Sequence, residues 1–134
     1  MIVIDTNLIA YLLVKGEHSE PAVDVLLKDA CWAAPLLWRS ELRNVLVTCV
    51  RGGLTELSDA FRIMSEAESL MHGNEYAVAS GDVLSLAVSS SCSAYDAEFV
   101  VLARGLGVPL VTTDRHLLES FPDTAVSLAG FLAG

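Results

Sequence analysis

The sequence predicts an α/β fold in which helices cover a parallel sheet. Short apolar runs rich in β-branched residues, the first of them Ile2-Val3-Ile4, show no polar alternation. Such runs are typical of strands that are buried on both faces of a parallel sheet. Segments with apolar residues at helical spacing separate these runs, so that strands and helices alternate along the chain, as in β-α-β units.

Composition and length favour a single compact domain over residues 1–134. Hydrophobic residues make up 53% of the 134 residues and charged residues 19%, without an internal repeat or a linker. The apolar run of residues 8–14 is far shorter than the about 20 residues that cross a bilayer, so we expect no membrane span, and no secretory leader. Three scattered cysteines favour buried free thiols in a reducing cytoplasm over disulfides.

Helix and strand signals divide the first half of the chain. The first strand stops at Asp5, Ser19 followed by Glu-Pro is typical of a helix start, Pro35 closes the second apolar run, and Gly52-Gly53 ends a helical pattern. We therefore expect strands at residues 2–4 and 31–34, and helices at residues 8–14, 19–28, 37–50 and 55–71.

Glycine and serine clusters separate the elements of the second half. Gly73-Asn74 ends one helix, the serine-rich residues 89–93 form a connection, and Gly107 follows another helix. Pro109 has no backbone N–H to donate to a neighbouring strand. It is therefore expected either at the start of the next strand or on an edge strand. We expect strands at residues 75–78, 108–112 and 125–128, the last of them at an edge of the sheet. We expect helices at residues 80–88, 94–106 and 114–119, the first of them capped by Ser80 or Asp82. A turn is expected at residues 129–133.

Two acidic residues follow predicted strands. Asp5 comes directly after the first strand, and Asp114 comes after the strand of residues 108–112. Ligands of open α/β sheets bind beyond the carboxyl ends of the strands, so both carboxylates would lie on one rim. Each acid can instead be the N-cap of the helix that follows it. Taken alone, neither residue decides between these interpretations.

Two further acids lie on predicted helices. Residues three and four positions from Glu41 are mostly apolar, so Glu41 needs a partner on that face or must extend to water. Arg39 and Arg43, two positions away, do not lie beside it on a helix. Asp96 stands three residues after Ser93, the spacing of a capping box, and can serve the helix start rather than a ligand.

A shared cation explains the four acids together. Carboxylates on one rim repel one another, which raises their pKa values unless a cation neutralises them. Ligand sets made only of oxygen select Mg²⁺ or Mn²⁺ over zinc, and such ions polarise phosphates and activate water. The net charge of −9 disfavours nucleic acid unless a metal site holds some of these carboxylates, and it favours a basic partner segment.

Four motifs carry a family resemblance: IVIDTNL (residues 2–8), SEL (residues 40–42), SAYDA (residues 93–97) and LVTTD (residues 110–114). They resemble the motifs of PIN-domain ribonucleases, and most of all those of the VapC-type toxins of bacterial toxin–antitoxin pairs. The resemblance implies a three-layer α/β/α sandwich around a mostly parallel sheet, Mg²⁺- or Mn²⁺-dependent endoribonuclease activity, a homodimer and an antitoxin partner. By motif position it implies an acidic quartet of Asp5, Glu41, Asp96 and Asp114, with Asp5 and Asp96 as direct metal ligands, and with Asn7 and Thr112 orienting the quartet or the attacking water.

We therefore predict a nuclease in which water attacks an RNA phosphodiester in line; by resemblance the products carry 5′-phosphate and 3′-hydroxyl ends. A PIN-fold module that has lost turnover and only holds RNA or a partner stays open, although all four acids are present. An aspartyl phosphatase or receiver-like domain is disfavoured because Asn7 breaks the D-x-D pattern and no lysine follows a late strand. Trp32, Trp38 and Tyr95 are expected in the core or an interface, although an exposed Tyr95 can stack on a base. The three histidines are expected at the surface or at helix ends, and the alternative for His116, two residues after Asp114, is that it reaches the rim.

Overall fold

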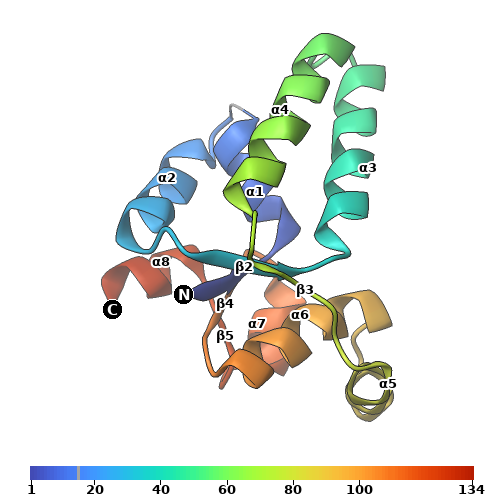
Figure 1. Ribbon diagram of the computed structural model, residues 1–134. Helices are drawn as coiled ribbons and strands as arrows, with labels where there is room; N and C mark the ends of the chain where they lie inside the picture. The colour runs from blue at the N-terminus through green and yellow to red at the C-terminus, as the bar shows by residue number, and fades with distance from the viewer. Residues whose placement is uncertain (15) are drawn as a thin grey trace.

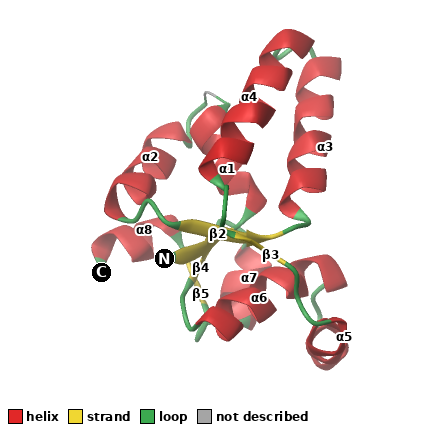
Figure 2. Cartoon of the chain, in the orientation of Figure 1, coloured by secondary structure: helices red, strands yellow, loops and turns green. Residues whose placement is uncertain are grey.

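The structure is a computed structural model that describes residues 1–14 and 16–134, and a parallel sheet lies at its centre (Figures 1 and 2). In the described residues the strands are β1 (Ile2–Ile4), β2 (Trp32–Pro35), β3 (Glu75–Tyr76), β4 (Leu110–Val111) and β5 (Ala125–Val126). The strand order is β3-β2-β1-β4-β5, and every pairing is parallel. β1 is therefore central, between β2 and β4.

Helices cover both faces of this sheet. The described helices are α1 (Thr6–Leu13), α2 (Ser19–Lys28), α3 (Trp38–Arg51), α4 (Leu57–Leu70), α5 (Ser80–Ser89), α6 (Ala94–Leu106), α7 (Arg115–Ser120) and α8 (Leu128–Ala133). In the view of Figure 1, α1 to α4 lie above the sheet, and α5, α6 and α7 lie below it. This arrangement confirms the predicted three-layer α/β/α sandwich.

The strands lie at the centre of the hydrophobic core. Every residue of β1, β2 and β4 is buried, as expected for strands that are covered on both faces. Trp32 and Trp38 are fully buried, and their indole N–H groups donate to the Asp29 carbonyl at 2.9 Å and to Glu75 Oε1 at 2.8 Å. The prediction that both tryptophans are core residues is confirmed.

Most predicted elements are present, with ends displaced by at most two residues. α1 begins at Thr6, two residues earlier than predicted, because Asp5 caps it. Pro109 immediately precedes β4, which lies inside the sheet, so the proline marks a strand start. β5 is an edge strand, as predicted.

Three local predictions are wrong. The turn expected at residues 129–133 belongs to helix α8, because Ser127 Oγ caps it by accepting from the Gly130 N–H at 3.0 Å. Ser19 does not cap α2; its Oγ accepts from the Gly16 N–H at 3.0 Å. The residue before α5 is Ala79, so neither Ser80 nor Asp82 is the N-cap.

The cysteines and helix lengths bear on the remaining predictions. Cys31, Cys49 and Cys92 are free thiols, but only Cys92 is buried; the other two are half-buried because they lie at the margins of the core. In the described ranges, each helix falls short of the length and apolar character that crossing a bilayer requires.

Candidate active site

The strand register brings Asp5 and Asp114 to the same rim of the sheet. Ile4 is opposite Val111 in the parallel pairing of β1 with β4. The Asp5 N–H donates to the Val111 carbonyl at 3.1 Å, which places the residues after both strands side by side. Both carboxylates thus lie beyond the carboxyl ends of adjacent central strands, where open α/β sheets bind ligands.

Thr112 connects these two residues. Its Oγ1 donates to Asp5 Oδ2 at 2.7 Å and accepts from the Asp114 N–H at 3.0 Å. The Thr112 side chain is fully buried, so water cannot take over either bond. One hydroxyl thereby fixes the orientation of the Asp5 carboxylate relative to the backbone of Asp114.

Asp5 and Asp114 also cap helices, as the alternative interpretation proposed. Asp5 Oδ1 accepts from the Asn7 N–H at 3.4 Å, and Asp114 Oδ1 accepts from the Leu117 N–H at 3.2 Å. A carboxylate has about four acceptor positions, so each cap leaves lone pairs free for another ligand. Capping and a place in the site are therefore compatible.

Glu41 finds its polar partner on α1. The Thr6 hydroxyl donates to Glu41 Oε1 at 2.8 Å, and Thr6 itself is buried. This contact supplies the partner that a half-buried Glu needs. Sequence reasoning missed Thr6 because 35 residues separate the pair, and no local spacing signals such a contact.

Ser93 and Asp96 form only one of the two hydrogen bonds of a capping box. Ser93 Oγ accepts from the Asp96 N–H at 3.0 Å, which caps α6. Within the described part of the chain, the Asp96 carboxylate makes no hydrogen bond back to the Ser93 N–H. Its two oxygens therefore stay available to a ligand.

A cavity of about 450 Å³ brings the four acids together. The residues that line it are Asp5, Thr6, Asn7, Leu37, Ser40, Glu41, Asn44, Val45, Tyr95, Asp96 and Asp114. Thr112 lies beside this cavity, hydrogen-bonded to Asp5. Ser40 and Asn44 were not predicted as site residues, although Asn44 follows Glu41 by three residues and so shares its helix face.

Tyr95 and His116 differ in their relation to this cavity. Tyr95 lines the cavity and is 64% exposed, so it is not a core residue, and its ring is accessible to a base. His116 Nε2 instead lies 3.3 Å from Ser91 Oγ, and its ring does not contribute to the lining.

Burial and mutual repulsion act on the acids in this cavity. The pKa of Asp5 is raised mainly by burial and further by the charges of Asp114 and Asp96, while hydrogen bonds from Thr112 and Asn7 oppose the rise. The pKa of Glu41 is also raised, mainly by burial, with the Thr6 hydrogen bond opposing and the charges of Asp5 and other acids adding to it. A bound cation would relieve this repulsion.

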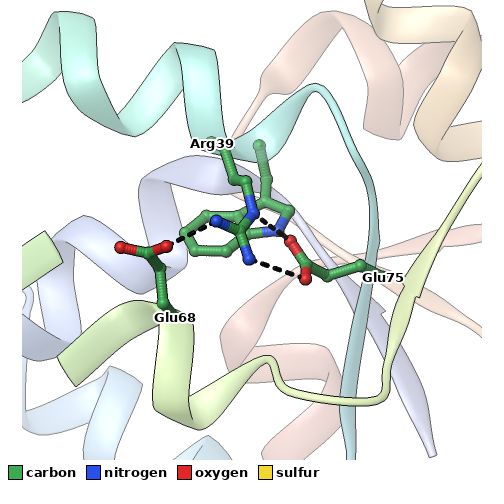
Figure 3. A network of polar contacts seen from close by, with 4 residues as sticks. Arg39, Glu68 and Glu75 are labelled. Atoms are coloured by element: carbon green, nitrogen blue, oxygen red, sulfur yellow. Dashed lines mark hydrogen bonds and ion pairs between the residues drawn. The ribbon is translucent and has the colours of Figure 1, made fainter. Parts of the chain in front are cut away.

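A polar network fixes the first turn of α3, which carries Glu41 (Figure 3). Arg39 donates through Nε and Nη2 to the Glu75 carboxylate and through Nη1 to Glu68, so it ties α3 to β3 and α4. The Trp38 indole donates to the same Glu75 carboxylate. Arg39 lowers the pKa of Glu75 and, as predicted, does not pair with Glu41.

The donor set of the cavity fits a hydrated hard cation. All of its charged ligands are carboxylates, which favour Mg²⁺ or Mn²⁺. Over residues 1–14 and 16–134, no three His, Cys, Asp or Glu side chains lie close enough to hold a metal ion by themselves. Mg²⁺ usually retains several waters and takes one or two carboxylates directly, so this looser arrangement fits such an ion.

Comparisons with known proteins agree with this architecture. Residues 2–122 match the family model described as the PIN domain. The chain is 32% identical to Ribonuclease VapC3 of Pyrobaculum aerophilum over 124 residues, which cover 90% of this chain and 95% of that protein. The crystal structure of PAE2754 from Pyrobaculum aerophilum superposes with a TM-score of 0.76 at 23% identity, covering 98% of this chain and 86% of that chain, and so supports the fold alone.

The chain therefore belongs to the PIN-domain family. Within this family, the predicted similarity to the VapC-type ribonucleases is confirmed by the relative at 32% identity.

Proposed function

We propose that this protein is a Mg²⁺- or Mn²⁺-dependent endoribonuclease and the toxin of a cytoplasmic toxin–antitoxin pair. The observation that carries the proposal is the cavity at the carboxyl edge of the sheet, into which four distant segments each contribute one acid. Similarity to a protein named Ribonuclease VapC3 supports RNA as the substrate. The free cysteines agree with a reducing compartment.

The proposed chemistry assigns a role to each polar residue. Asp5, Glu41, Asp96 and Asp114 would hold a hydrated cation, with Asp5 and Asp96 as its direct ligands, and the cation would supply polarisation of the phosphate and activation of water for in-line attack. Thr112 and Thr6 keep the carboxylates of Asp5 and Glu41 in fixed orientations through their hydrogen bonds. Asn7 is exposed and lines the cavity, where its amide can orient the attacking water or the phosphate.

An apolar groove between α3 and α4 supports the proposal of an antitoxin partner. The groove has a volume of about 360 Å³, and Val47, Leu57 and Phe61 in its lining are exposed, Phe61 to 67%. Contiguous exposed apolar surface of this kind marks protein interaction sites. Arg43 and Arg51 also line the groove, where they can pair with acids of the partner. The homodimer is proposed from the resemblance, without a surface assigned to it.

Cleavage of a mixed RNA pool tests the function. Antitoxin-free protein is incubated with the pool and Mg²⁺ or Mn²⁺, beside EDTA and the variant Asp96→Asn. The variant Asp82→Asn is a matched control, because Asp82 is, like Asp96, an acid in the first turn of a helix but lies outside the cavity. We expect cleavage by the wild type and by Asp82→Asn, and none with EDTA or Asp96→Asn.

The other outcomes identify the alternatives. If folded, metal-bound protein binds RNA without cleaving it, the inactive binding module is the better description. Cleavage that survives both EDTA and Asp96→Asn would come from another site or from a contaminant, and the proposed metal site would be wrong.

A further inference from the structure

A second cavity, of about 480 Å³, lies at the carboxyl ends of β4 and β5. Its lining includes Thr112 and Thr113, which follow β4, and Ser127, which follows β5. Thr112 is also the residue that donates to Asp5. One buried threonine therefore links the second cavity directly to the acidic cavity.

An aromatic pair extends from the acidic cavity to the second one. Asn7 lines the acidic cavity, and Tyr11 lies four residues later on the same face of α1. The Tyr11 hydroxyl is 3.4 Å from Thr113 Oγ1, and the Tyr11 ring packs against the His18 ring, with centroids 4.6 Å apart and the planes tilted by 33°. His18 in turn lines the second cavity. Asn7, Tyr11 and His18 therefore connect the acidic cavity with the second one along α1.

The lining of the second cavity fits a nucleobase better than a phosphate. Leu118 and Leu128 supply apolar surface for the flat face of a ring, and His18 can stack on a base. Glu20 and Asp24 on α2 add two exposed carboxylates, which repel phosphate but accept hydrogen bonds from amino groups. Carboxylates recognise the exocyclic amino group of cytosine in this way.

We propose that the second cavity binds the base of a nucleotide next to the cleaved phosphodiester and selects bases with an exocyclic amino group. Glu20 or Asp24 accepts from this amino group, while His18 stacks on the ring. Uracil is disfavoured because it presents a carbonyl oxygen to the carboxylates. The inference rests on the proposed ribonuclease function and adds a base preference to it.

Binding of two short RNAs tests this subsite without requiring turnover. Fluorescein-labelled octamers of cytidine and of uridine are each titrated with the Asp96→Asn protein in the presence of Mg²⁺. These octamers are compared because cytosine carries an amino group at C4 where uracil carries a carbonyl oxygen. We expect the C octamer to bind about tenfold more tightly, within the range that one well-made base contact gives. In the background of Asp96→Asn, the added pair Glu20→Ala and Asp24→Ala should reduce this ratio to below about twofold.

Two further sets of variants separate the subsite from general charge effects. Glu56→Ala with Asp82→Ala removes the same two charges at exposed positions outside the cavity, so both octamers should bind more tightly and the ratio should stay. His18→Ala should weaken both octamers about tenfold through lost stacking, and His18→Phe should restore them. An equal affinity for the two octamers, or a ratio that survives loss of Glu20 and Asp24, would overturn the proposal.

The failure of this proposal differs from a failure of the proposed function. RNA cleavage by the wild type with Mg²⁺ tests the nuclease, whereas the C-to-U ratio of the non-cleaving variant tests the subsite. Cleavage without a base preference leaves the nuclease and removes the subsite. A base preference without cleavage removes the nuclease and leaves the second cavity as a base-selective site of an RNA-binding protein.

Discussion

Replacing Thr112 by valine should weaken both the fold and the site. Valine keeps the shape of threonine but removes the hydroxyl, which donates to Asp5 Oδ2 and accepts from the Asp114 N–H. Because Thr112 is fully buried, no water can replace either bond. The Asp5 carboxylate then loses a hydrogen bond that opposes the rise of its pKa, so this pKa should rise further.

The magnitude follows from the two bonds that are lost. A hydrogen bond to a charged group contributes about 1.5 to 3 kcal/mol, and a buried N–H left without an acceptor costs about 1 to 3 kcal/mol. Both energies come from the same hydroxyl group and are not fully additive. We therefore expect Thr112→Val to lower the free energy of unfolding by about 2 to 4 kcal/mol. That is a large fraction of the about 5 to 15 kcal/mol of an ordinary domain.

Thr112→Ser is the matched control. Serine keeps the hydroxyl and loses one buried methyl group, which should cost about 1 kcal/mol. Urea unfolding followed by circular dichroism in EDTA measures both variants without the contribution of a metal. RNA cleavage with Mg²⁺ should be largely kept by serine and lost by valine.

Two results would refute this reasoning. If Thr112→Val unfolds within about 0.5 kcal/mol of the wild type, the hydroxyl does not hold the rim together. If Thr112→Ser loses as much cleavage as Thr112→Val, the methyl group and not the hydrogen bonds supports the site.

Three other changes test the electrostatics of the site and its supports. Asp5→Asn should abolish cleavage. It should also raise the melting temperature in EDTA, because it removes a buried charge that the charges of Asp114 and Asp96 repel. A lower melting temperature in thermal unfolding would contradict this. The pKa of Glu75 is lower in the folded protein than its ordinary value of 4.5. The ionised carboxylate therefore stabilises the folded state at pH values above 4.5, and this stabilisation is lost as the pH falls through the pKa of the folded state. Glu75→Gln should therefore be less stable than the wild type at pH 7 and lose less stability on acidification, as urea midpoints across pH would show. Thr6→Val removes the donor to Glu41 and should lower the cleavage rate at least about tenfold, because a hydrogen bond to a charged group contributes about 1.5 kcal/mol or more and about 1.4 kcal/mol corresponds to a factor of ten. An unchanged rate would remove Thr6 from the site.

Local patterns were enough to predict the α/β class with a parallel sheet, whereas the three-layer sandwich was predicted from the family resemblance. The β1 run is apolar without alternation because it is covered on both faces, and this pattern is visible in the three residues Ile2–Ile4. Element ends were less predictable, because caps depend on backbone angles. Ser19 and Ser127 illustrate this. Ser127 has the extended backbone that an N-cap needs, and its Oγ accepts from the Gly130 N–H, whereas Ser19 is itself the first residue of α2 and its Oγ accepts from the Gly16 N–H in the preceding loop.

The acids of the site were predictable, but their supporting residues were not. Asp5 and Asp114 follow strands, a position that fits both the rim and a helix N-cap, and the set of four acids favoured the rim. The hydrogen bond from Thr6 to Glu41 spans 35 residues, and that from Thr112 to Asp5 spans 107. Contacts at such separations are created by the strand order, which single-sequence patterns do not contain. Thr112 was predicted through the motif that it shares with a family, whereas Thr6 had no such assigned role.

The cap interpretation and the site interpretation of the acids have one physical basis. Asp5 and Asp114 are the N-caps of α1 and α7, and Asp96 and Glu41 lie in the first turns of α6 and α3. The amino-terminal end of a helix carries unpaired N–H groups and a partial positive charge, which stabilises a nearby carboxylate. Four helix starts that meet at one rim therefore offset part of the repulsion among four acids before any cation binds. For this reason each acid fits the sequence pattern of a helix start, and all four acids nevertheless line the same cavity.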